Sequence, residues 1–135
     1  MFLYAPESYW NASQEDRDSI CNGCGVNGWK GKLVPDRIYF LNITEACNIH
    51  DWMYYEGETI KDKEEADRTF LNNMCRIIDD KTYFSFMTTL RKDRAWIYYL
   101  AVHKFGGPAF WDGKNPPESM QELALTTGNA DFNLF

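Results

Sequence analysis

The sequence is short of positive charge and of long apolar runs. The chain has 14 lysine and arginine residues and 20 acidic residues, which gives a formal net charge of −6. Binding to nucleic acid needs a basic field that displaces counterions from phosphates, so this balance argues against a nucleic-acid partner. No apolar run approaches the roughly 18 to 20 residues of a membrane-spanning helix, and we therefore expect any membrane contact to be peripheral.

The sequence also shows no export signal and has few cysteines. Residues 1–7 contain no basic segment and no long apolar core, so we see neither a signal peptide nor a mitochondrial presequence. We therefore expect a cytoplasmic, phage-associated or non-classically secreted protein. Four cysteines allow three pairings into two disulfides, or four reduced thiols, and the sequence does not choose between them.

Apolar and aromatic residues are plentiful by comparison. A chain of 135 residues with 44% hydrophobic residues suits one folded domain with one core, and we expect a single domain over 1–135. Aromatic residues make up 16% of the chain. This surplus suits an apolar ligand slot or an interfacial surface, with dense core packing as the equal alternative.

The periodicity predicts a mainly α-helical fold with two helices that carry the site and a third long helix. A glycine-rich loop over 21–36 precedes a helix over about 44–56, whose special residues follow a spacing of three and four. A second helix runs from about 59 to 79 and carries an acidic residue, Asp67, on an otherwise apolar stripe. The short connection predicts antiparallel packing of these two helices. A third helix is predicted over about 83–105, before the Gly-Gly-Pro sequence at 106–108.

The first two helices bring together residue types suited to hydrolysis. His50 has a side chain suited to proton abstraction near neutral pH, and a buried Asp67 could accept a hydrogen bond from its far ring nitrogen. Asp51 points about 100° away around the helix, where its oxygens suit a hard cation such as calcium. Glycines in the preceding loop allow carbonyl oxygens to converge on the metal, and the Gly25 amide could stabilise an oxyanion.

The segment Cys47-Asn-Ile-His-Asp-Trp-Met-Tyr54 resembles the Cys-x-x-His-Asp-x-x-x-Tyr helix of phospholipases A2. The segment 24–28, Cys-Gly-Val-Asn-Gly, is similar to that family's calcium loop, with asparagine in place of one glycine. The likeness covers residues 21–78 and is strongest to compact microbial and viral members. It implies a phospholipase A2-type carboxylic ester hydrolase that cleaves the sn-2 ester of glycerophospholipids with calcium, at a membrane or micelle surface.

The resemblance also implies a role for each matching residue. It makes His50 the base, Asp67 its orienter and Tyr54 a support of that aspartate, and it implies a disulfide between Cys24 and Cys47. The implied calcium ligands are the side chain of Asp51 and the backbone carbonyl groups of Gly23, Gly25 and Asn27.

Two other interpretations stay open. Cys21, Cys24, Cys47 and His50 have the residue types and spacing of a structural zinc site. Alternatively, the chain could be an inactive relative that binds lipid or protein, because Asn27 departs from the glycine of the calcium loop. The sequence does not indicate an oligomeric state.

Overall fold

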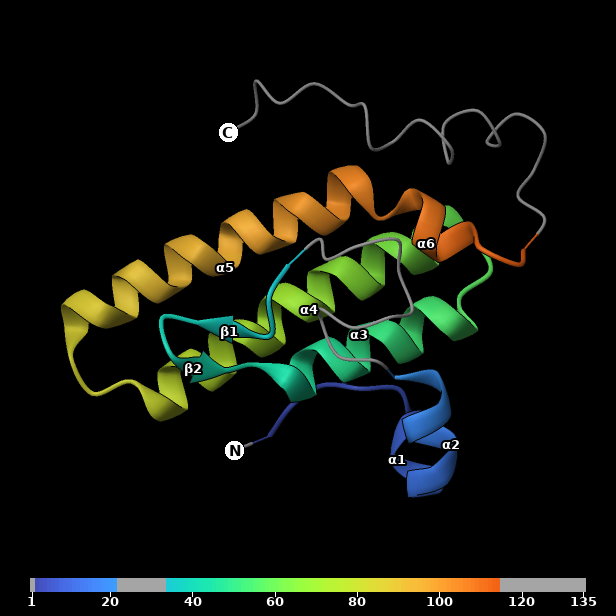
Figure 1. Ribbon diagram of the computed structural model, residues 1–135, viewed down its shortest axis with the longest axis horizontal. Helices are drawn as coiled ribbons and strands as arrows, with labels where there is room; N and C mark the ends of the chain where they lie inside the picture. The colour runs from blue at the N-terminus through green and yellow to red at the C-terminus, as the bar shows by residue number, and fades with distance from the viewer. Residues whose placement is uncertain (1, 22–33, 115–135) are drawn as a thin grey trace.

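The computed structural model describes residues 2–21 and 34–114, which form a mainly helical structure with a small β-hairpin (Figure 1). None of the helices in these ranges is both long enough and apolar enough to span a membrane. In chain order the elements are α1 (Glu7–Asn11), α2 (Gln14–Ile20), β1 (Arg37–Ile38), β2 (Leu41–Asn42), α3 (Thr44–Glu56), α4 (Ile60–Lys81), α5 (Ser85–Phe105) and α6 (Gly107–Trp111).

The helix α3 begins and ends where the sequence predicts. The Asn42 side chain accepts a hydrogen bond from the Thr44 amide at 2.7 Å, which satisfies one of the unpaired amides at the helix start. Gly57 follows the last turn and its amide donates to the Met53 carbonyl. Six residues of α3 are buried, including His50.

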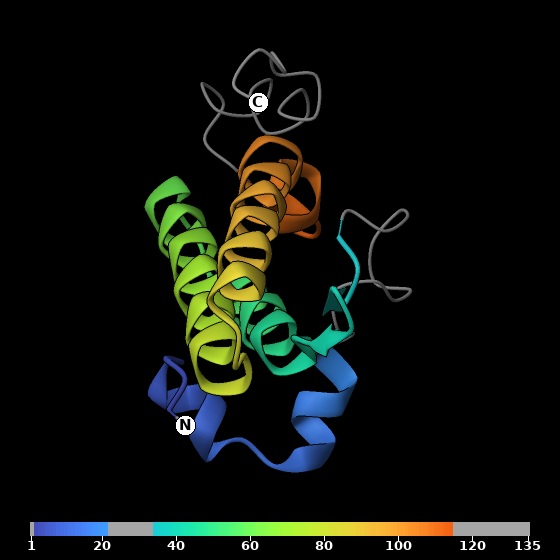
Figure 2. The same ribbon diagram turned by 90° about the vertical axis from the view of Figure 1, so that its left-hand side faces the viewer.

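The helix α4 is fixed by a capping box and an apolar stripe. The Thr59 hydroxyl accepts from the Asp62 amide at 3.1 Å, while the Asp62 carboxylate accepts from the Thr59 amide at 3.1 Å. Along the helix, Asp67 and Phe70 are buried in the stripe. The two helices α3 and α4 run antiparallel (Figure 1), as predicted, and α4 also packs against α5. Figure 2 shows the three long helices as neighbouring rods.

The helix α5 begins at Ser85, two residues after the predicted start, and ends before Gly106 as expected. Its apolar residues lie all around the helix, so the sequence pattern did not define one buried face. Leu100 is buried, whereas Phe86, Leu90 and Ile97 on the same helix are exposed. The other buried residues of α5 are Ala95, Tyr98 and Val102.

The N-terminal arm is attached to the long helices by side chains. The buried Asn73 of α4 accepts from the Tyr4 amide at 2.8 Å and donates to the Tyr4 carbonyl at 2.7 Å, so it pairs with the backbone as a neighbouring strand would. Tyr9 on α1 packs against Trp52 of α3 with ring centroids 5.7 Å apart. Trp52 is therefore a core residue.

Candidate active site

Asp67 is the centre of a buried polar cluster. Its side chain is 0% exposed on α4, opposite the middle of α3. Oδ1 lies 2.8 Å from His50 Nε2 and accepts a hydrogen bond from the Tyr54 hydroxyl at 2.7 Å. Oδ2 accepts from Lys63 Nζ at 2.8 Å. The structure therefore brings His50 and Asp67 together as the helical periodicity predicted, and it places Tyr54 on the same carboxylate oxygen.

The imidazole of His50 is held by its neighbours on both faces. Its ring centroid lies 4.1 Å from that of Tyr54 and 4.7 Å from that of Phe70. Because the ring is confined in this way and Nε2 contacts Asp67, its orientation is fixed before any substrate binds. This is the geometry in which a carboxylate orients a histidine.

The cluster keeps Asp67 ionised and Tyr54 protonated. Burial alone raises the pKa of Asp67, but the hydrogen bonds and charges of His50 and Lys63 outweigh it and hold the carboxyl below its usual value. Burial, followed by the charge of Asp67, raises the pKa of Tyr54 well above its ordinary value. Tyr54 therefore remains a hydrogen-bond donor to an anionic Asp67 throughout the physiological range.

This shift predicts a loss of stability in acid. The pKa of Asp67 is lower in the folded protein than in the unfolded chain, so the unfolded chain binds more protons as the pH falls. The stabilisation is complete above the ordinary pKa of 3.8 and is lost as the pH falls through the lower folded value. Urea unfolding at a series of acid pH values measures it. The double variant Lys63→Met with Asp67→Asn should lose less stability than wild type, and equal losses would contradict the assignment.

Lys63 is the member of the cluster that the sequence interpretation missed. It lies four residues before Asp67 on α4 and is 3% exposed. Besides Asp67, its ammonium group donates to two carbonyl groups near the end of α5, those of Val102 at 3.2 Å and His103 at 3.3 Å, so each of its three protons has a partner. A lysine at this spacing on the buried stripe was the available signal, because a buried carboxylate needs a counter-charge.

The end of α5 also limits the space around Tyr54. Gly106 follows the last residue of α5, and a Cβ atom at this position would collide with the Tyr54 hydroxyl and with the Val102 carbonyl oxygen. The glycine that ends the helix therefore leaves room for the hydroxyl that contacts Asp67.

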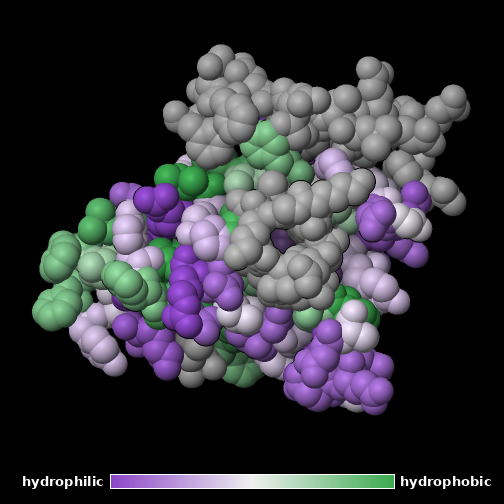
Figure 3. All heavy atoms as spheres, viewed as in Figure 1, coloured by the Kyte–Doolittle hydropathy of each residue, from purple (hydrophilic) through white to green (hydrophobic). Residues whose placement is uncertain are grey.

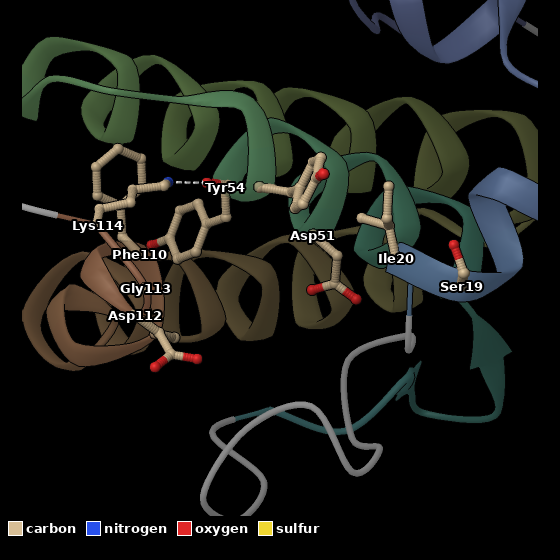
Figure 4. A pocket seen from close by; sticks show the side chains of 10 residues that line it. Ser19, Ile20, Asp51, Tyr54, Phe110, Asp112, Gly113 and Lys114 are labelled. Carbon is tan, nitrogen blue, oxygen red and sulfur yellow. Dashed lines mark hydrogen bonds between the residues drawn. The ribbon is translucent and has the colours of Figure 1, made fainter.

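Asp51 lies next to His50 on α3 but opens onto a different surface. It lines a cavity of about 440 Å³ between α3, the end of α2 and the segment that includes α6 (Figure 4). Tyr54 and the buried Phe110 contribute to the wall, and Asp112 is the second carboxylate that lines it. The division of His50 and Asp51 between two directions follows the 100° step of the helix.

The remaining predicted calcium ligands lie outside the described residues. Gly23, Gly25 and Asn27 fall within 22–33, as does Cys24, so their predicted roles stay predictions. Of the cysteines that the structure describes, Cys21 and Cys75 are free thiols. Among the predicted calcium ligands, Asp51 is therefore the one whose position the structure describes. As a half-buried carboxylate at the wall of a cavity, it fits a hard cation.

The zinc interpretation stays a prediction, because Cys24, one of its four ligands, falls within 22–33. Among the residues described, no group of three or more His, Cys, Asp or Glu side chains is arranged to hold a metal. The Cys21 thiol donates to the Asn48 carbonyl at 3.1 Å, and burial together with the charges of Asp51 and Glu45 raises its pKa to about 12. Zinc binding itself lowers the pKa of a ligating thiol, and a zinc-bound histidine commonly gives its other ring nitrogen to a carboxylate, as His50 gives Nε2 to Asp67.

The partner of His50 comes from the adjacent antiparallel helix, since Asp67 lies on α4 and His50 on α3. The chain matches no protein-family model, no curated protein and no solved structure.

Proposed function

We propose that this protein is a calcium-dependent esterase of the phospholipase A2 type, which hydrolyses the sn-2 ester of glycerophospholipids. The observation that supports the proposal most strongly is the buried contact of 2.8 Å between His50 Nε2 and Asp67 Oδ1. A solvent-exposed histidine beside an aspartate is common, but a buried, oriented histidine next to a cavity-lining carboxylate has the parts of a hydrolytic site.

In the proposed reaction His50 is the general base. Because Nε2 contacts Asp67, the proton must be taken by Nδ1, which removes it from the attacking water. The imidazolium that forms is stabilised by the anionic Asp67, and Tyr54 holds the same carboxylate oxygen in place. Lys63 keeps Asp67 anionic from the other oxygen. No serine or cysteine nucleophile is required.

Asp51 supplies a carboxylate for calcium, together with the backbone carbonyl groups of Gly23, Gly25 and Asn27. Bound calcium supplies Lewis-acid polarisation of the ester carbonyl. In this proposal the backbone amide of Gly25 donates a hydrogen bond to the developing oxyanion. The acyl part of the lipid would lie against the apolar wall that Phe110 contributes to the cavity.

The proposal is tested by fatty-acid release from phosphatidylcholine micelles, with calcium and with a chelator. We expect fatty-acid release only with calcium. Loss of a partner outside the metal's ligands can lower activity by roughly 100-fold, so we expect Asp51→Asn, which removes a direct ligand, to lower the rate by at least that factor. Asp80→Asn is the matched control, because Asp80 is an exposed carboxylate near the end of α4 that does not line the cavity, and this variant should keep activity.

Calcium binding has a second readout that does not depend on catalysis. A cation that binds only the folded protein stabilises it and raises its unfolding temperature. At a free cation concentration of 100 times the dissociation constant, the added free energy of unfolding is about 2.7 kcal/mol. Wild type should show this rise and Asp51→Asn should not. Absence of calcium-dependent release from wild type would defeat the esterase, whereas retained activity in Asp51→Asn would defeat the metal role alone.

A further inference from the structure

Large apolar side chains gather at the end of the molecule where two turns meet, on the left in Figure 3. One turn joins β1 to β2, and the other joins α4 to α5; Figure 2 looks at this end. We call this surface the aromatic end. It consists of Tyr39, Phe40, Tyr83, Phe84, Phe86 and Leu90, which are between 40% and 93% exposed.

The backbone of the β-hairpin is strained in a way that presents Phe40 to solvent. Tyr39 has φ 43° and Phe40 has φ 70°, and the left-handed region is unfavourable for bulky side chains. Two-residue hairpin turns of this hand normally use asparagine or glycine. Phe40 is 93% exposed, so packing of its side chain does not compensate for the strain. A strained residue without a packing role points to a function of its side chain.

Two arginines of α5, Arg91 and Arg94, hold the two turns together, and Arg37 stabilises the hairpin turn itself. Arg91 donates to the Tyr39 carbonyl at 2.7 Å and to the Thr82 hydroxyl at 2.9 Å, and therefore bridges the hairpin and the connection between α4 and α5. Arg94 donates to the Tyr39 hydroxyl at 2.9 Å. Arg37 donates to the Phe40 carbonyl at 3.3 Å. The two turns form one surface because these contacts connect them.

The charge of the aromatic end is opposite to that of the whole chain. Segments 36–42 and 79–94 contain five cationic and four acidic residues, while the chain as a whole carries −6. Lys81 and Lys92 pair with carboxylates near the end of α4. The arginines contact neutral oxygens, and none of the ion pairs between described residues includes Arg37, Arg91 or Arg94. Their positive charge is therefore available to an anionic partner.

We propose that the aromatic end docks on an anionic lipid bilayer, with Phe40 and Phe84 inserted at the level of the headgroups and the arginines beside lipid phosphates. Aromatic side chains favour the boundary between water and acyl chains, and cations next to them are attracted to anionic lipid. The protruding Phe40 suits insertion into a fluid interface, which needs no matching protein surface.

This surface is separate from the candidate active site. Asp67 lies in the first half of α4, whereas the aromatic end follows Lys81, the last residue of the same helix. At 1.5 Å per residue the two are about 20 Å apart along the helix. Docking is therefore independent of the proposed hydrolysis, and the His50→Gln variant should bind bilayers as well as wild type does.

The test is co-sedimentation with vesicles of equal parts phosphatidylglycerol and phosphatidylcholine, and with vesicles of phosphatidylcholine alone. We expect wild type to bind the anionic vesicles more strongly, and we expect binding to weaken as salt is added. The double variant Phe40→Gly with Phe84→Ser should have an affinity for the anionic vesicles at least about tenfold lower than that of wild type, because two inserted rings are lost. Trp10→Ser is the control, since Trp10 is 44% exposed on α1 and should not contribute.

Stability separates docking from a structural role of the same residues. Phe40→Gly relieves the positive φ, so its unfolding temperature should equal or exceed that of wild type while its vesicle binding falls. Absence of vesicle binding by wild type, or equal loss in Trp10→Ser, would overturn the proposal. So would a dimer of wild type that Phe40→Gly dissociates, because the surface would then bind a second copy of this chain.

Discussion

Replacement of His50 by glutamine is expected to lower calcium-dependent release of fatty acid by about 10²- to 10⁴-fold, the range that a general base contributes. Glutamine fills a similar volume and can still donate a hydrogen bond to Asp67, so the buried cluster should persist. It has no nitrogen that can take a proton near neutral pH. The loss should appear in the initial rate at saturating calcium, while the unfolding temperature changes little.

The chain contains a natural control for this substitution. Its other histidine, His103, lies in the last turn of α5 and stacks on Tyr99 with ring centroids 5.6 Å apart. The same change, His103→Gln, keeps the backbone carbonyl that Lys63 contacts. Its rate should stay within a factor of a few of wild type. Equal rates for wild type and His50→Gln would remove His50 from the mechanism and leave the site without a base.

Replacement of Lys63 by methionine is expected to destabilise the protein by about 3 kcal/mol, at the lower end of the cost of breaking a buried ion pair. Methionine replaces the aliphatic part of the lysine side chain but leaves Asp67 Oδ2 without its donor. The value is at the lower end because Oδ1 keeps its contacts with His50 and Tyr54. Urea unfolding at neutral pH measures the difference in free energy.

Lys61→Met is the matched control for that experiment, because Lys61 is an exposed lysine in the first turn of the same helix. A surface substitution of this kind should change stability by no more than about 0.5 kcal/mol. In addition, Asp67→Asn should cost less in the Lys63→Met background than in wild type, since the cation that it would leave unpaired is gone. Independent, additive effects of the two substitutions would contradict the buried pair.

The part of the candidate site around His50 and Asp67 was predictable because its residues follow local rules. His50 and Asp51 diverge by one helical step, and Asp67 interrupts an apolar stripe, so their burial and directions follow from helix geometry. The contact between His50 and Asp67 follows from one short connection between antiparallel helices. Lys63 is different, because lysines on helices are usually solvated and its burial depends on carbonyl groups at the far end of α5.

The sequence by itself determined the three long helices and the buried faces of α3 and α4, since capping residues and periodicity act over a few positions. The tertiary structure alone decided which side of α5 is buried, because apolar residues on all sides give no preferred face until a neighbouring helix covers one. It also decided that the β-hairpin and the turn after α4 form one aromatic surface. Arg91 joins two segments about 40 residues apart in sequence there, a contact that depends on folding rather than on any local pattern.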